Sequence, residues 1–134
     1  MAGYSTRSLQ DKLGIKPGKT VLLLNAPEGY GDVLGLLPDG VDLRRALRGE
    51  LDFIHAFFET RADFDARLPK LKACLAKDGM LWISWRKGGP KSGTDMNENV
   101  VRDAALAAGL VDVKVAAIDA VWSGLKLVYR LKDR

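Results

Sequence analysis

The sequence predicts a three-layer α/β fold, in which helices cover a mostly parallel sheet that ends in a C-terminal antiparallel hairpin. Glycine turns precede three apolar segments, and the order of helix, glycine and apolar strand is typical of α/β chains. The segments 21–24 and 53–58 are almost continuously apolar, as in parallel strands that are covered on both faces. The segment 111–118 alternates apolar and polar residues instead, which indicates an antiparallel strand at the edge of the sheet.

We expect six strands, at 20–25, 41–43, 53–58, 80–85, 111–118 and 122–131. We expect four helices, at 6–13, 30–37, 60–76 and 95–108. Pro69 is expected to split the third helix, because proline suits the first turn of a helix better than its interior. Asp95 and Glu98 have the spacing of a capping box at the start of the fourth helix. The last strand is expected at an exposed edge, where it could pair with a second copy to form a homodimer.

Length and composition are those of a single α/β domain over residues 1–134. Hydrophobic residues make up 47% and charged residues 28%, which excludes a disordered chain, a collagen-like repeat and a disulfide scaffold. The net charge of +4 and the isoelectric point near 9.3 favour anionic partners, without by themselves indicating a nucleic-acid-binding protein. One cysteine, no signal-peptide pattern and no apolar run of membrane-spanning length predict a cytoplasmic protein that does not enter a membrane.

Candidate ligand-binding residues lie where the strands of the predicted sheet end. In open α/β sheets ligands bind outside the carboxyl ends of the strands, so the segments 25–31, 55–58, 85–91 and 119–123 should converge. No set of metal ligands, no nucleophile elbow and no catalytic set is recognisable, so we expect no metal site and leave open whether the protein is an enzyme. The candidates for the crevice are Asn25, Glu28, Gly29, His55, Phe57, Trp85, Lys87 and Asn99.

The loop 25–31 has only part of the pattern of a nucleotide-binding loop. Gly29 and Gly31 would let backbone N–H groups approach a ligand closely, whereas Pro27 removes one donor. The only acidic candidate for contact with ribose hydroxyls on the second strand is Asp42. A turn that merely starts a helix is therefore the alternative interpretation of this loop.

The single histidine and the basic loop also allow two interpretations each. His55 could act as a general base, although a lone histidine in an apolar strand is more often a buried, hydrogen-bonded core residue. The loop 86–91 carries three cations and could hold a phosphate or an RNA backbone, with Trp85 stacking on a base, or it could be a solvated loop. Asn99 could reach the crevice from the fourth helix.

Several strings, among them LNAP at 24–27, DFIHAFF at 52–58 and GMLWISW at 79–85, resemble an uncharacterised bacterial family of small cytosolic proteins, a domain of unknown function. The order of the elements, with its reversed last strand, resembles a shortened Rossmann-like fold of the methyltransferase type over residues 17–131. These resemblances imply a fold but no catalytic residue. One departure is Arg86, which stands where the family has proline. The other strings that carry the resemblance to the uncharacterised family lie at 3–5, 12–18, 94–95, 98–102, 109–115 and 122–128.

Three classes of function remain open from the sequence. The first is a Rossmann-like module without a catalytic set, which binds a small anionic ligand or a protein partner. The second is a divergent S-adenosylmethionine-dependent methyltransferase, which the element order and the residues 28–31 favour. The third is a weak RNA- or DNA-binding protein, which the basic isoelectric point and the loop 86–91 favour. No cofactor can be named from the sequence.

Overall fold

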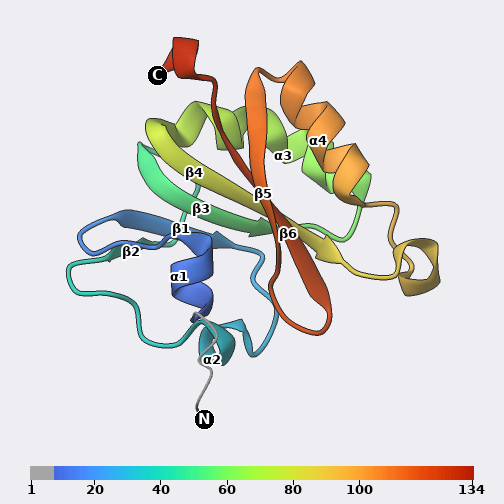
Figure 1. Cartoon of the computed structure of the whole chain (residues 1–134), viewed down its shortest axis with the longest axis horizontal. Helices are drawn as coiled ribbons and strands as arrows, with labels where there is room; N and C mark the ends of the chain where they lie inside the picture. Colours follow the sequence, from blue (N-terminus) through green and yellow to red (C-terminus); the bar gives the residue numbers. More distant parts are fainter. Residues whose placement is uncertain (1–7) are drawn as a thin grey trace.

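A six-stranded sheet with the order β2-β1-β3-β4-β6-β5 forms the middle layer of the computed structural model, which describes residues 8–134 (Figure 1). Neighbouring strands from β2 to β4 pair in parallel, whereas β6 pairs antiparallel with both β4 and β5. The mostly parallel sheet with a C-terminal antiparallel hairpin is thus confirmed. The strands are β1 (Thr20–Leu24), β2 (Asp42–Arg44), β3 (Leu51–Phe57), β4 (Leu75–Arg86), β5 (Leu110–Ala117) and β6 (Trp122–Tyr129).

Helices cover the two faces of the sheet unequally. One face carries two short helices, α1 (Leu9–Leu13) and α2 (Tyr30–Leu34). The opposite face carries two longer ones, α3 (Arg61–Cys74) and α4 (Glu98–Ala107). Two 3₁₀ turns, η1 (Gly89–Ser92) and η2 (Leu131–Asp133), complete the described elements. None of these helices combines the length and the apolar character that crossing a membrane requires.

Two hydrophobic clusters hold the layers together, because successive side chains of a strand point to opposite faces of the sheet. On the side of α3 and α4, Phe64 and Leu71 pack against Ile54 and Leu81, all fully buried. On the side of α1 and α2, the largest fully buried side chain is Trp82. Both faces of the central strands are therefore apolar, which explains why their sequences do not alternate.

Two helix predictions were wrong in detail. Pro69 does not split α3, which continues through it as one helix because Leu68 and Leu71 pack into the core on either side of it. The capping box at the start of α4 does not form. The side chain of Asn97 caps this helix by accepting a hydrogen bond from the Val100 N–H, and Asp95 instead accepts one from the backbone N–H of Arg61.

The position of the last strand also differs from the prediction. β6 is not an edge strand, since it lies between β4 and β5 and forms hydrogen bonds on both sides. The edge is β5, whose pairing with β6 is shifted between Asp112 and Lys114. A shift of this kind and an edge lysine both disfavour strand pairing with another chain. Pairing with a second copy through 122–131, which the sequence left open, therefore has no free strand edge to use.

Candidate functional site

A cavity of about 390 Å³ opens at the carboxyl ends of β1 and β3, where the strand order reverses. In open α/β sheets such a reversal leaves a crevice that takes ligands. The cavity brings together residues from the loop after β1, the end of β3, the start of α3, the end of β4 and the start of β6. They are Asn25, Pro27, Glu28, Phe57, Phe58, Glu59, Asp63, Arg86 and Trp122.

Asn25, which lines this cavity, holds the loop after β1 in place. Its backbone φ of 57° is left-handed, a conformation that asparagine tolerates better than most residues. Its side-chain Nδ2 donates a hydrogen bond of 3.2 Å to the carbonyl oxygen of Phe57, the last residue of β3. The turn out of β1 is thereby tied to the end of the neighbouring strand, which keeps the loop before α2 close to the cavity.

The charged side chains of the cavity are mostly acidic. Three carboxylates, those of Glu28, Glu59 and Asp63, face one guanidinium, that of Arg86. The Nε of Arg86 lies 2.8 Å from Oε1 of Glu59, and its guanidinium lies 4.9 Å from the ring centroid of Trp122. Within residues 8–134, Glu28 and Asp63 take part in no ion pair. The lining therefore keeps a surplus of negative charge.

Aromatic rings close the inner side of the cavity. Phe57 lies edge-on to Trp122, with ring centroids 5.2 Å apart, and stacks on His55 at 4.1 Å. His55 is fully buried behind Phe57, so it cannot touch a ligand in the cavity. Its place is that of a core residue rather than a general base.

His55 forms the centre of a buried hydrogen-bonded chain. Nδ1 lies 2.6 Å from the Tyr30 hydroxyl and Nε2 lies 2.7 Å from Oγ of Ser84. A neutral ring with its proton on Nε2 accepts from Tyr30 and donates to Ser84, which satisfies both nitrogens. Burial lowers the pKa of His55 to about 3, and burial together with the charge of Asp119 raises the pKa of Tyr30. These three hydrogen-bonded side chains are therefore uncharged at neutral pH, and they link α2 to β3 and β4.

Among the predicted residues, Asn25, Glu28 and Phe57 line the cavity. Gly29 lies beside it, as the N-cap of α2 with a positive φ of 85°. Besides the buried His55, the other three predicted residues lie elsewhere. Trp85 packs in the core on the side of α3 and α4, whereas the Nζ of Lys87 donates to the carbonyl of Asp119 and Asn99 accepts from Arg102 on α4.

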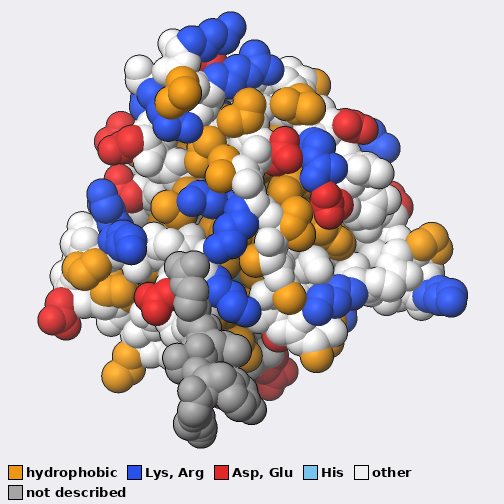
Figure 2. All heavy atoms as spheres, viewed as in Figure 1, with side chains coloured by type: hydrophobic (Ala, Val, Ile, Leu, Met, Phe, Trp, Pro, Cys, Tyr) orange, Lys and Arg blue, Asp and Glu red, His pale blue; other side chains and the backbone are white. Residues whose placement is uncertain are grey.

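The basic loop is less available than its composition indicates. Arg86 turns into the cavity and Lys87 is bonded to the hairpin turn, which leaves Lys91 as the third cation of the loop. Figure 2 shows Lys and Arg side chains over the face that carries α1, interrupted by hydrophobic and acidic side chains instead of joined in one patch. This arrangement does not favour a surface that follows a phosphate backbone.

Sequence reasoning missed the acidic residues that follow β3. Thr60 caps α3 by accepting from the Asp63 N–H, and this turn brings Asp63 beside Glu59 at the cavity. The signal was present, because carboxylates directly after a buried strand point to the carboxyl edge of a sheet. Asp42, the candidate for ribose contact, lies at the opposite end of β2, which ends in Arg44.

The structure is similar to solved methyltransferases over nearly the whole chain. A SAM-dependent methyltransferase from Aquifex aeolicus superposes with a TM-score of 0.60 and 18% identity over 89% of this chain and 86% of that one. The magnesium protoporphyrin IX methyltransferase of Synechocystis, solved with bound SAH, superposes with a TM-score of 0.60 and 12% identity over 90% of this chain and 78% of that one. The chain has the methyltransferase-like Rossmann fold. Fibrillarin, a pre-rRNA processing protein of Methanococcus jannaschii, superposes with a TM-score of 0.59 and 12% identity over 95% of this chain and 70% of that one.

No family model matches the sequence, and no curated protein matches it either. The methyltransferase-like fold expected from the order of elements is therefore confirmed, and at identities of 12% to 18% the likeness concerns the fold alone. The resemblance to an uncharacterised bacterial family receives no support from these matches.

Proposed function

We propose that this protein binds a small, positively charged molecule in the cavity at the carboxyl edge of the sheet, and that S-adenosylmethionine is the first such molecule to test. The observation that carries the proposal is the lining of three carboxylates and three aromatic rings around one guanidinium. Carboxylates attract a cation by charge, and the guanidinium of Arg86 over the ring of Trp122 shows that the aromatic lining accepts a cation too. The same lining repels the anionic ligand that the net charge of the chain had favoured.

S-adenosylmethionine fits this lining by its charge. It carries a sulfonium and an ammonium group beside one carboxylate, so its net charge is opposite to that of the cavity. Glu28 and Asp63, which have no ion-pair partner within residues 8–134, would hold the cationic groups, and Trp122 would contact the apolar part. Among these residues no three His, Cys, Asp or Glu side chains are placed to hold a metal ion. When bound, S-adenosylmethionine supplies an activated methyl group.

The proposed role is binding rather than a complete catalytic cycle. His55 is sealed behind Phe57 and stays neutral, so it offers no base to a molecule in the cavity. The end of β2 offers Arg44 in place of a carboxylate for ribose hydroxyls. Methyl transfer is the second candidate, which the fold of the solved neighbours favours.

Isothermal titration calorimetry with three ligands tests the proposal. We expect S-adenosylmethionine to bind at least about fivefold more tightly than S-adenosylhomocysteine, which lacks the sulfonium charge, and ATP not to bind. Glu28→Gln should weaken the binding of S-adenosylmethionine by about fivefold. The matched control Glu50→Gln, before β3 at the opposite end of the sheet, should leave the affinity unchanged. Absence of heat with S-adenosylmethionine up to about 1 mM, or tighter binding of ATP, would refute the proposal.

A further inference from the structure

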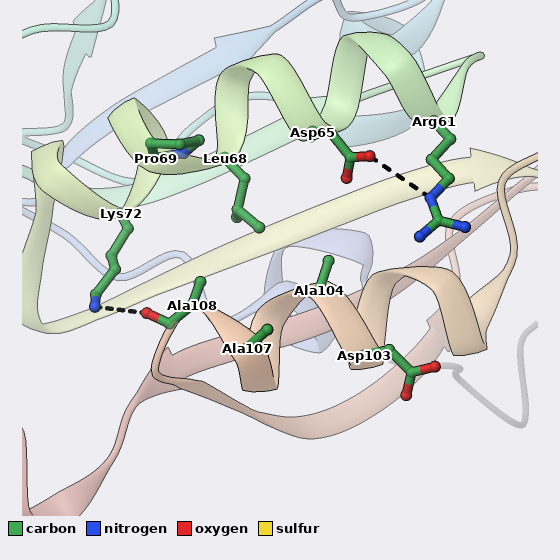
Figure 3. A pocket seen from close by; sticks show the side chains of 9 residues that line it. All are labelled: Arg61, Asp65, Leu68, Pro69, Lys72, Asp103, Ala104, Ala107 and Ala108. Carbon is green, nitrogen blue, oxygen red and sulfur yellow. Dashed lines mark hydrogen bonds and ion pairs between the residues drawn. The ribbon is translucent and has the colours of Figure 1, made fainter.

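A second hollow lies between the two long helices, and none of its lining residues lines the cavity at the carboxyl edge. Figure 3 shows α3 and α4 side by side with a groove between them, whose volume is about 690 Å³. Its floor is made of small or apolar side chains, and charged side chains stand on both rims. The lining residues are Arg61, Asp65, Leu68, Pro69, Lys72, Asp103, Ala104, Ala107 and Ala108.

The two rims carry opposite charge. On the α3 rim, Arg61 lies 3.6 Å from Asp65 in an exposed ion pair, and Lys72 donates to the carbonyl of Ala108. On the α4 rim stands Asp103, which has no ion-pair partner within residues 8–134. The α3 rim thus has a surplus of one positive charge, and the α4 rim has one negative charge.

The same difference in charge extends along both helices. The sequence of α3 contains four cations and two carboxylates. The sequence of α4 contains Glu98, Asp103 and one cation, Arg102, which binds both Glu98 and Asp112. A basic helix and an acidic helix therefore lie next to each other on one face.

We propose that this face is the contact surface of a homodimer, in which α3 of each copy lies against α4 of the other. A two-fold axis parallel to the helices brings about this exchange, and it pairs the basic helix of one copy with the acidic helix of the other. Arg61 and Asp103 lie at the same end of the groove, so the axis would set Arg61 of each copy against Asp103 of the other (Figure 3). The small side chains of Ala104, Ala107 and Ala108 allow a helix to approach closely.

The lining favours a second copy over other occupants. A small-molecule site needs a few polar groups that converge on the ligand, whereas the charges here stand apart on the rims. A partner helix with one sign of charge would be repelled by one of the two rims. The helices are about 21 and 15 Å long, so the contact is small and the dimer should dissociate on dilution.

Sedimentation equilibrium of the full chain over a range of concentrations tests the homodimer. The wild type should dimerise, and Asp103→Lys and Arg61→Glu should each raise the dimer dissociation constant at least about tenfold. An equimolar mixture of the two variants should dimerise again, because both contacts in the mixed dimer then join opposite charges. The charge-matched controls Asp39→Lys and Arg48→Glu change exposed residues outside the groove and should leave the dimer unchanged.

Three results would overturn the proposal. One is a wild type that stays monomeric up to about 1 mM. Another is a wild-type dimer that both groove variants retain, because the contact would then lie on another surface. The third is a mixture of Asp103→Lys and Arg61→Glu that stays monomeric although each variant keeps the circular dichroism spectrum of the wild type. None of these results depends on ligand binding in the cavity at the carboxyl edge.

Discussion

Replacing Trp82 by alanine is expected to lower the free energy of unfolding by about 3 to 5 kcal/mol. Trp82 is fully buried in the middle of β4, on the face that carries α1. Its indole Nε1 donates a hydrogen bond of 2.8 Å to the carbonyl of Leu13 at the end of α1. The substitution removes the largest fully buried side chain and the bond that holds this short helix on the sheet.

Urea unfolding followed by circular dichroism measures this loss, and Trp82→Phe separates its two causes. Phenylalanine keeps most of the buried apolar surface but cannot donate to Leu13, so we expect it to cost about 1 to 2 kcal/mol. A loss below about 1 kcal/mol for Trp82→Ala would show that Trp82 does not hold the α1 layer. An equal loss for both variants would assign the whole effect to the hydrogen bond.

Acidification from pH 7 to pH 4 is expected to cost roughly 3 kcal/mol of stability through His55 alone. Burial lowers the pKa of this side chain to about 3 in the folded protein, against an ordinary value of 6.5. Between these values the unfolded chain binds a proton that the folded chain does not. Stability is therefore complete above pH 6.5 and falls as the pH is lowered towards 3.

The difference between wild type and His55→Gln isolates this contribution. Glutamine is uncharged over the whole range, so this variant should be less stable than the wild type at pH 7 and should lose less stability by pH 4. Carboxylates contribute to both curves and cancel in the difference. Urea unfolding at half-unit pH intervals provides the curves. Parallel curves between pH 7 and pH 4 would mean that the native ring is protonated as easily as the unfolded one.

Local sequence signals were sufficient for the strands and their order along the chain. The apolar run of β3 specifies a buried parallel strand, because few other structures accommodate such a run. Gly79 was expected in a turn before the next strand, but β4 begins directly after α3 and contains this glycine. The place of β6 could not be predicted in the same way. Alternation in β5 indicates antiparallel pairing, but it does not say which strand of the hairpin lies beside β4, since that pairing joins segments far apart in the sequence.

The candidate site could be predicted only in part, for a similar reason. Asn25 and Glu28 follow β1 directly, and a strand end is visible in the sequence. Asp63 reaches the cavity only because Thr60 turns the chain into α3, and Trp122 because β6 is inserted next to β4. Trp85 was placed in the crevice from its position at a strand end, but its side chain points to the other face of the sheet.

Nuclear magnetic resonance of the ¹⁵N-labelled protein with S-adenosylmethionine tests the ligand proposal most directly. The three tryptophans give three indole N–H signals, and only Trp122 lines the cavity, whereas Trp82 and Trp85 lie in the core. We expect the Trp122 indole and the backbone amides of Glu28 and Glu59 to shift during the titration. An unchanged Trp122 signal, or shifts confined to the groove between α3 and α4, would contradict binding at the carboxyl edge of the sheet.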